Sequence, residues 1–358
     1  MAAAMRLSRW HTGLTATNPS VAALVVRDGA IVGQAVTATG GRPHAETQAL
    51  AVAGEKARGA TLYVTLEPCS HHGKTPPCAD AIVAAGISRV VVSLTDPDPR
   101  VSGRGLAILR EAGIAVESGV MEGEGRRALS AYLMRQTRGR PEVTLKLAVS
   151  ADGMIGRKGA GQLAITGPAA RAQVHVLRAQ MDAILVGIGT ARADDPDLTC
   201  RTPGLENRSP SRVVLDRDLD LPLTSRLVKT AREVPVLIAS LPVSHAHSTA
   251  ERNARIERRQ ALTAEGVEVL EPESLPMLLA ALAARGISSL LVEGGARVAR
   301  SFLDAGLVDR ILLFEGAVSV GADAIASPIT RSDIPAGFRA VREASFGPDR
   351  LIDFERSS

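Results

Sequence analysis

Short runs of aliphatic and β-branched residues alternate with amphipathic segments along the whole of this 358-residue chain. Short apolar runs bounded by turn residues are typical of strands, and the longer segments between them carry the periodicity of helices. This alternation is typical of a sheet covered by helices, so the sequence predicts the α/β fold class. Aromatic residues make up only 2% of the chain, and buried parallel strands favour the aliphatic side chains that must fill the cores instead.

The first part of the chain predicts one domain over residues 1–140. Its predicted strands span residues 21–26, 30–36, 61–66, 89–94 and 114–119, and its predicted helices span residues 44–56, 77–85, 105–112 and 122–138. Gly86 and Gly113 are suitable helix ends because glycine readily adopts the left-handed conformation found there. The last helix runs into a polar Arg-Gly-Arg-Pro stretch, and we place the domain boundary at residues 139–142.

The same alternation resumes in a second predicted domain, over residues 143–358. Its predicted strands span residues 143–150, 183–186, 212–215, 234–238, 289–292 and 310–314, and its predicted helices span residues 168–179, 276–285 and 296–305. Residues 242–260 are rich in His, Ser and Arg, and we expect this stretch to be solvated. The chain is long enough for each domain to bury a core of its own.

The composition indicates which classes of molecule this chain can bind. The net charge is +4, no run of five like charges occurs, and the chain has one Trp, two Tyr and five Phe. A nucleic-acid-binding surface usually interleaves basic and stacking aromatic residues, which this composition does not supply. The three cysteines are an odd number, as expected for reduced thiols. Charged residues among the first ten lie where a signal peptide would need an apolar stretch, and the apolar runs of the chain are too short to span a membrane. We expect a soluble cytoplasmic protein that acts on small molecules, and a homo-oligomer is compatible with the sequence.

Two motifs carry the residue types of a zinc site. The first is Pro-His-Ala-Glu at Pro43–Glu46, and the second is E-P-C-S-H-H-G-K-T-P-P-C at Glu67–Cys78. The imidazole of His44 and the thiolates of Cys69 and Cys78 suit Zn²⁺, which takes nitrogen and sulfur ligands. Three protein ligands leave one position open for water, as in catalytic zinc sites. Glu46, two residues after His44, is then suited to move protons as a general acid–base.

Two other interpretations of these motifs are open at this point. His71 or His72 could complete a closed structural zinc site, or two buried cysteines could lie near an unrelated histidine. A structural site has no use for a glutamate beside its histidine, which favours the catalytic interpretation. Cys200 lies far from both motifs, in the second domain, and we predict that it only packs there.

The motifs carry a family resemblance. H-A-E followed by P-C-x8-C resembles the cytidine-deaminase-like superfamily, and residues 67–78 are similar to the deaminase domain of bifunctional riboflavin-biosynthesis deaminase–reductases. Editing deaminases of nucleic acids have the shorter P-C-x-x-C spacing. The resemblance implies a cytidine-deaminase-like α/β/α fold, with a substrate held by Asn18, His71, Lys74 and Asp96, of which Lys74 would pair with its 5′-phosphate. The sequence departs from the family at Ala22, where Gly is frequent, and at Asp98, where Asn is usual.

Three segments of the second domain resemble the reductase domain of the same family: Lys146–Gly153, residues 177–201, and Leu291–Gly295. The resemblance implies a dihydrofolate-reductase-like α/β fold that uses NADPH. It assigns to the cofactor side Ala148, Ala164, Thr190, Asp194 and Gly295, and to the substrate side Arg178, Leu198, Arg201 and Glu293. The two arginines are suitable phosphate clamps. Ala164 stands where many relatives have a Trp.

The resemblance implies a bifunctional enzyme of riboflavin biosynthesis. It would hydrolyse the 2-amino group of 2,5-diamino-6-ribosylamino-4(3H)-pyrimidinone 5′-phosphate and then reduce 5-amino-6-(5-phosphoribosylamino)uracil to the ribityl compound with NADPH. An RNA- or DNA-editing deaminase is one rival hypothesis, and a non-catalytic zinc module joined to a nucleotide-binding domain is another. Release of ammonia from the pyrimidine separates the enzyme from the second rival.

Overall fold

The computed structural model describes residues 1–71, 76–98, 101–159, 161–246 and 248–357. The chain folds into two compact units, Met1–Arg140 and Pro141–Ser358. The division falls within the polar stretch that follows the last helix of the first unit. No helix in the described ranges is both long and apolar enough to cross a lipid bilayer.

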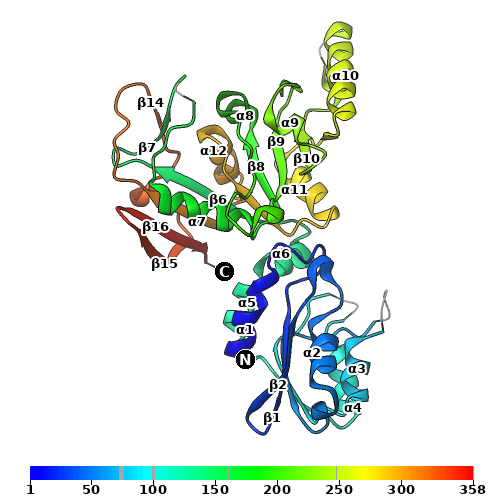
Figure 1. The fold of residues 1–358 in the computed structure, drawn as a ribbon. Coiled ribbons are helices and arrows are strands. Elements are labelled where there is room, and N and C mark those ends of the chain that lie inside the picture. The colour runs from blue at the N-terminus through cyan, green and yellow to red at the C-terminus, as the bar shows by residue number, and fades with distance from the viewer. Residues whose placement is uncertain (72–75, 99–100, 160, 247, 358) are drawn as a thin grey trace. The chain divides into compact units, whose positions relative to one another are not determined.

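The first unit is a five-stranded sheet between two layers of helices (Figure 1). Its strands are β1 (Ala22–Arg27), β2 (Ala30–Val36), β3 (Thr61–Leu66), β4 (Arg89–Leu94) and β5 (Ala115–Ser118), and its helices are α1 (Ala2–Ser8), α2 (Ala45–Ala53), α3 (Cys78–Ala84), α4 (Arg104–Glu111), α5 (Glu122–Ala128) and α6 (Ser130–Arg138). The strand order is β2-β1-β3-β4-β5. Strand β1 is antiparallel to both neighbours, whereas β3, β4 and β5 are parallel.

Successive residues of β1 face opposite helix layers, because side chains alternate across a strand. Ala23 and Val25 belong to the core that includes the buried residues of α2, whereas Ala22 and Leu24 pack with α1. Helix α2 lies very close to the sheet, since a Cβ added at Gly33 of β2 would come within 2.2 Å of the Ala49 carbonyl oxygen. This close packing fixes the helix whose first turn carries the H-A-E motif.

The second unit is built on a nine-stranded sheet in the order β11-β10-β9-β8-β12-β6-β13-β16-β15, with β7 and β14 paired separately. Its strands are β6 (Glu142–Val149), β7 (Met154–Arg157), β8 (Ala183–Gly187), β9 (Ser211–Leu215), β10 (Val236–Ala239), β11 (Glu268–Leu270), β12 (Ser289–Val292), β13 (Arg310–Glu315), β14 (Ala324–Ala326), β15 (Phe338–Phe346) and β16 (Asp349–Arg356). Its helices are α7 (Pro168–Arg178), α8 (Ile188–Asp194), α9 (Arg226–Lys229), α10 (Thr249–Ala264), α11 (Leu275–Ala284) and α12 (Ala296–Asp304). The sheet is parallel from β11 to β13 and ends in the antiparallel hairpin β15–β16.

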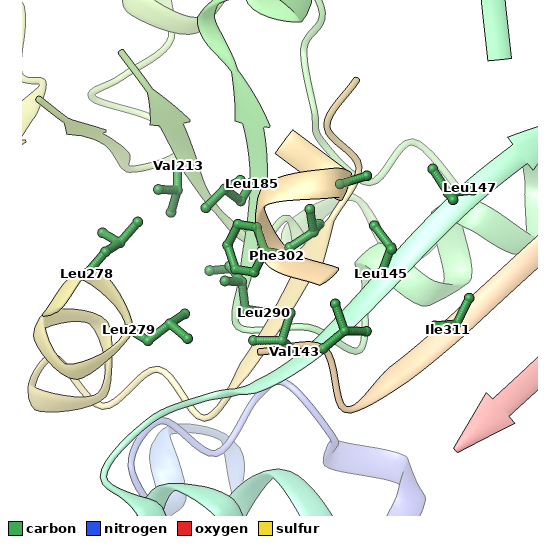
Figure 2. Close-up of a cluster of buried hydrophobic side chains, with 14 of the residues drawn as sticks. Val143, Leu145, Leu147, Leu185, Val213, Leu278, Leu279, Leu290, Phe302 and Ile311 are labelled. Atoms are coloured by element: carbon green, nitrogen blue, oxygen red, sulfur yellow. The ribbon is translucent and has the colours of Figure 1, made fainter. Parts of the chain in front are cut away.

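Both faces of the central strands of this sheet are buried, which explains their continuous apolar runs. On one face, Phe302 of α12 lies among Leu145, Leu185 and Leu290 from three neighbouring strands (Figure 2). On the other face, Ile184 and its alternate neighbours join a second cluster with buried residues of α9 and α10.

The α/β prediction is confirmed, and three local differences have physical reasons. The helix expected over residues 122–138 is two helices, because Leu129 leaves the helical conformation (φ −110°, ψ 12°). Helix α10 crosses the stretch expected to be solvated and begins where the Ser248 side chain accepts a hydrogen bond from the Glu251 amide. The hairpin β15–β16 was not predicted, because β15 is mostly exposed and lacks a clear apolar alternation. The sequence pattern also missed the short elements α1, α8, α9, β7, β11 and β14.

Candidate active sites

Three elements of the first unit bring the two zinc motifs together. His44 is the N-cap of α2, Cys69 follows the end of β3, and Cys78 begins α3. Nδ1 of His44 and the two Sγ atoms all lie within 4.8 Å of one another. The Nδ1 atom is 3.7 Å from Sγ of Cys69 and 3.4 Å from Sγ of Cys78. Tetrahedral zinc with ordinary bond lengths would separate nitrogen and sulfur ligands by about 3.6 Å, so these atoms fit the ion.

The number of ligands favours an open site over a closed one. Among the described residues the group contains these three side chains and does not include His71. His72, the other histidine considered as a fourth ligand, lies outside the described residues. Three protein ligands leave a coordination position for water or substrate.

The side chains of Cys69 and Cys78 shift each other's pKa in opposite directions. A hydrogen bond from Cys78 lowers the pKa of Cys69 to about 4, whereas the pKa of Cys78 is raised. The Cys78 backbone amide also donates to Sγ of Cys69 at 3.3 Å. A cation that replaced the shared thiol proton would bind both sulfurs as thiolates.

Glu46 is buried beside these ligands, in the first turn of α2, with 3% of its surface exposed. Burial raises the pKa of its carboxyl group to about 7. A carboxyl group with a pKa near neutrality can both accept and return a proton, which general acid–base catalysis requires.

Glu67 has a role in this unit that sequence reasoning missed. Its buried carboxylate accepts hydrogen bonds from the backbone amides of Asp96 (3.2 Å), Gly103 (3.0 Å), Gly105 (3.0 Å) and Leu106 (3.4 Å). A Cβ at Gly105 would lie 2.1 Å from the Pro68 carbonyl oxygen, so glycine is required where α4 meets this segment. Glu67 therefore connects the segment before Cys69 to the loop that carries Asp96. Its position in the E-P-C motif was the signal that could have identified it from the sequence.

The predicted substrate residues of the first unit come from separate segments. Asp96 is buried in the loop after β4, and His71 is half-buried after Cys69. Asn18 lies in a turn in which the Thr15 hydroxyl donates to the Asn18 carbonyl at 2.6 Å. A Cβ at Gly41 would lie 2.5 Å from Nδ2 of Asn18, so the turn packs tightly against that glycine. The predicted phosphate partner Lys74 lies outside the described residues.

The second unit has a cavity of about 1180 Å³ along the carboxyl ends of its central parallel strands. Ligands of open α/β sheets bind at such strand ends. All nine residues that sequence reasoning placed on the cofactor and substrate sides line this one cavity: Ala148, Ala164, Arg178, Thr190, Asp194, Leu198, Arg201, Glu293 and Gly295.

A buried charge cluster lies in the wall of the cavity. Arg178 donates from Nε to Oε1 of Glu293 at 2.9 Å and from Nη2 to Oε2 at 3.0 Å. Lys146 Nζ lies 3.9 Å from the same carboxylate. Burial alone would raise the pKa of Glu293, but Arg178 and Lys146 outweigh it and lower the pKa to about 2. Sequence reasoning did not assign Lys146 to the site. A lysine within an otherwise aliphatic strand was the signal that could have identified it.

The two arginines predicted as phosphate clamps differ in their surroundings. Arg178 also donates from Nη1 to the Thr199 carbonyl at 3.2 Å, and only 11% of its side chain is exposed. A phosphate would therefore have to compete with Glu293 for it. The Arg201 side chain is 54% exposed and pairs with Asp197 at 2.8 Å, which leaves it accessible from the cavity.

Comparison with known proteins decides the family. Residues 141–350 match the family described as the RibD C-terminal domain, and residues 1–94 match the zinc-binding region of cytidine and deoxycytidylate deaminases. The riboflavin biosynthesis protein RibD of Aquifex aeolicus is 39% identical over 99% of this chain and 97% of its own length. The chain belongs to the RibD family.

Solved structures of RibD proteins agree along the whole chain. RibD of Acinetobacter baumannii has a TM-score of 0.87 at 34% identity and covers 100% of this chain, with 98% of its own length covered. A diaminohydroxyphosphoribosylaminopyrimidine deaminase/5-amino-6-(5-phosphoribosylamino)uracil reductase from Thermotoga maritima has a TM-score of 0.84 at 34% identity, covering 99% of this chain and 97% of its own. RibD of Escherichia coli is 40% identical over 90% of this chain and 88% of its own.

This RibD-family chain is a bifunctional enzyme with a deaminase and a reductase domain, which confirms the predicted family, fold and enzyme class. The region matched to zinc-binding deaminases contains all three residues of the metal group. In this member of the RibD family, Ala164 is exposed on the cavity wall beside Leu163, which is 39% exposed.

Proposed function

We propose that residues 1–140 hydrolyse the 2-amino group of 2,5-diamino-6-ribosylamino-4(3H)-pyrimidinone 5′-phosphate and that residues 143–358 reduce 5-amino-6-(5-phosphoribosylamino)uracil with NADPH. The observation that carries the first activity is a buried carboxyl group beside three clustered zinc ligands. The second activity is supported by the single cavity lined by nine family-assigned residues. We further propose that the enzyme works in the cytoplasm, where its three free cysteines would remain reduced.

In the deaminase, His44, Cys69 and Cys78 would hold Zn²⁺, which supplies a Lewis acid that activates water when bound. Glu46 accepts the proton of the attacking water and delivers it to the leaving amine. Burial of the Glu46 carboxyl group raises its pKa, which favours uptake of a proton from the water and its later return to the amine. Asn18, His71 and Asp96 hold the pyrimidine and ribose, and Lys74 pairs with the phosphate.

In the reductase, the cavity positions the substrate against a nicotinamide cofactor, which supplies the hydride when bound. The cofactor side is formed by Ala148, Ala164, Thr190, Asp194 and Gly295. Gly294 and Gly295 precede α12, and a Cβ at Gly294 would lie 2.7 Å from the Val298 side chain. The close packing against Val298 explains the glycine, and the backbone amides at this helix start are suited to bind a cofactor phosphate.

The substrate side of the reductase is formed by Arg178, Leu198, Arg201 and Glu293. Arg178 orients Glu293, and Lys146 lies within reach of the same carboxylate. Glu293 accepts hydrogen bonds from the ribose hydroxyls, and Lys146 donates to them. Arg201, the more exposed of the two arginines, binds the substrate phosphate.

The decisive experiment supplies purified enzyme with the diaminopyrimidine phosphate and follows ammonia release and NADPH oxidation separately. We expect ammonia without cofactor and NADPH oxidation only after deamination, or with the deaminated compound alone. A non-catalytic zinc module would release no ammonia. Repeating the reductase assay with NADH tests the cofactor assignment, since comparable kcat/KM for both cofactors would contradict it.

A further inference from the structure

The carboxylate of Asp96 is buried but lies outside both zinc motifs. The hydroxyl group of Tyr132 on α6 lies 2.9 Å from Oδ1 and 3.1 Å from Oδ2 of Asp96, and the Asp98 amide donates to Oδ1 at 2.9 Å. The Tyr132 ring is part of the core, with 8% of its surface exposed. A buried tyrosine usually places its hydroxyl on a partner, and here that partner is a candidate substrate residue.

The next turn of the same helix reaches the other candidate substrate segment. Arg135 donates from Nη2 to the carbonyl oxygen of Thr17, the residue directly before Asn18. Residues three apart on a helix lie on one face, so Tyr132 and Arg135 point to the same side of α6. Neither zinc motif contains any part of this helix.

We propose that α6 positions the substrate side of the deaminase site, with Tyr132 orienting Asp96 and Arg135 holding the turn of Asn18. This inference rests on the substrate-binding role proposed above for those two residues. Tyr132 and the Asp98 amide satisfy part of the acceptor capacity of the Asp96 carboxylate. The remaining lone pairs are available to the N–H donors of an amino-substituted ring.

The charges around Asp96 make the role of Tyr132 measurable. Burial raises the pKa of Asp96, the hydrogen bonds from the Asp98 amide and Tyr132 oppose that rise, and the Asp98 and Glu67 carboxylates add to it. Among the described residues, Arg135 is a further charged group near Tyr132. Removal of the Tyr132 hydroxyl should raise the pKa of Asp96 further, so substrate binding should weaken at a higher pH than in the wild type.

The first test replaces Tyr132 by Phe in the full-length zinc enzyme, with Tyr63→Phe at the other tyrosine as the matched control. We expect the KM for deamination to rise about tenfold, as for a lost hydrogen bond to a charged group, with a smaller change in kcat. The rise in KM at acidic pH should begin at a higher pH than in the wild type. Zinc content and reductase activity should be unchanged in both variants, which verifies folding. A wild-type KM and pH profile in Tyr132→Phe would overturn the proposal.

A double-mutant cycle separates this inference from the proposed function. Asp96→Ala should raise the KM, and adding Tyr132→Phe to it should have little further effect, because the Tyr132 hydroxyl acts on the substrate only through the Asp96 carboxylate. If Asp96→Ala leaves the KM unchanged, the binding role of Asp96 is wrong and the positioning role with it. If Asp96→Ala raises the KM and the two effects simply add, only the positioning role of Tyr132 is wrong.

The contribution of Arg135 is tested in the same assay. Arg135→Met should raise the KM for deamination, whereas Arg138→Met, at an exposed position of the same helix, should not. Equal KM values for the two variants would overturn the part of the proposal that concerns Asn18.

Discussion

The guanidinium of Arg178 on α7 donates two parallel hydrogen bonds, of 2.9 and 3.0 Å, to the carboxylate of Glu293, which follows β12. Bidentate pairs of this kind fix orientation as well as charge. Only 11% of the Arg178 side chain and 9% of the Glu293 side chain are exposed. Glu293 also faces Lys146, so one carboxylate compensates two buried cations.

Glu293→Gln should destabilise the reductase unit and reduce its activity. The variant leaves Arg178 and Lys146 buried without their counter-charge, a type of loss that typically costs about 3–5 kcal/mol. Chemical denaturation, followed with a probe attached to the reductase unit, should show the lower free energy of unfolding. Deaminase activity should persist in the variant. The control is Glu343→Gln in the exposed pair with Arg331, which should cost about 1 kcal/mol or less. Equal stability of the two variants would contradict the buried-pair interpretation.

Removal of the metal should separate the two activities. A chelator that strips zinc should abolish ammonia release and leave NADPH-dependent reduction of the deaminated compound intact, because the metal group found among the described residues lies in the first unit. Elemental analysis should find one zinc per active chain. Fully active deaminase that contains no zinc would refute the metal assignment.

Substitution of single cysteines should identify the ligand set. Cys78→Ser should lose zinc and deamination, because the site would retain only two strong ligands. Cys200→Ser is the matched control, since Cys200 is buried in the second unit, where its thiol donates to the His175 carbonyl at 3.4 Å. Zinc loss in the Cys200 variant would show that the ligand set is wrong.

Glu46→Gln should retain zinc but slow deamination by ~10²-fold or more, because an amide cannot accept and return the proton. The exposed Glu55→Gln, a few residues further along the same segment, should behave as the wild type. The test compares the steady-state deamination rates of the two variants and the wild type at equal zinc occupancy. A Glu46 variant that loses zinc yet regains full activity on remetallation would exclude the proton-transfer role.

Ala164→Trp should tighten NADPH binding. The family resemblance implies an indole at this position in many relatives, and the alanine here is exposed on the cavity wall. A well-packed indole should lower the Kd about fivefold, which titration with NADPH would measure. Ala336→Trp, at an exposed position that does not line the cavity, serves as the control. Unchanged or weaker binding in the Ala164 variant would mean that Leu163 already fills the pocket.

The local patterns of the sequence were sufficient for the parts of the molecule that local chemistry determines. Cys69 and Cys78 lie within one short motif, so residue type and spacing indicated these candidate ligands without a structure. The β-branched runs marked the central strands because burial on both faces imposes an aliphatic composition. The same patterns missed α10, a helix with few buried residues, and the mostly exposed strand β15, because their residues carry little apolar periodicity.

Only the tertiary structure decided which distant residues act together. Tyr132 meets Asp96 across 36 residues, and Arg178 meets Glu293 across 115. No periodicity or motif encodes such pairs, because they depend on how the loops at the strand ends converge after the sheet has formed. The sequence by itself thus predicted the metal-binding motifs and the central strands. The burial that raises the pKa of Glu46 and the ion pair that lowers that of Glu293 arise from packing, which removes these carboxyl groups from water and selects their partners.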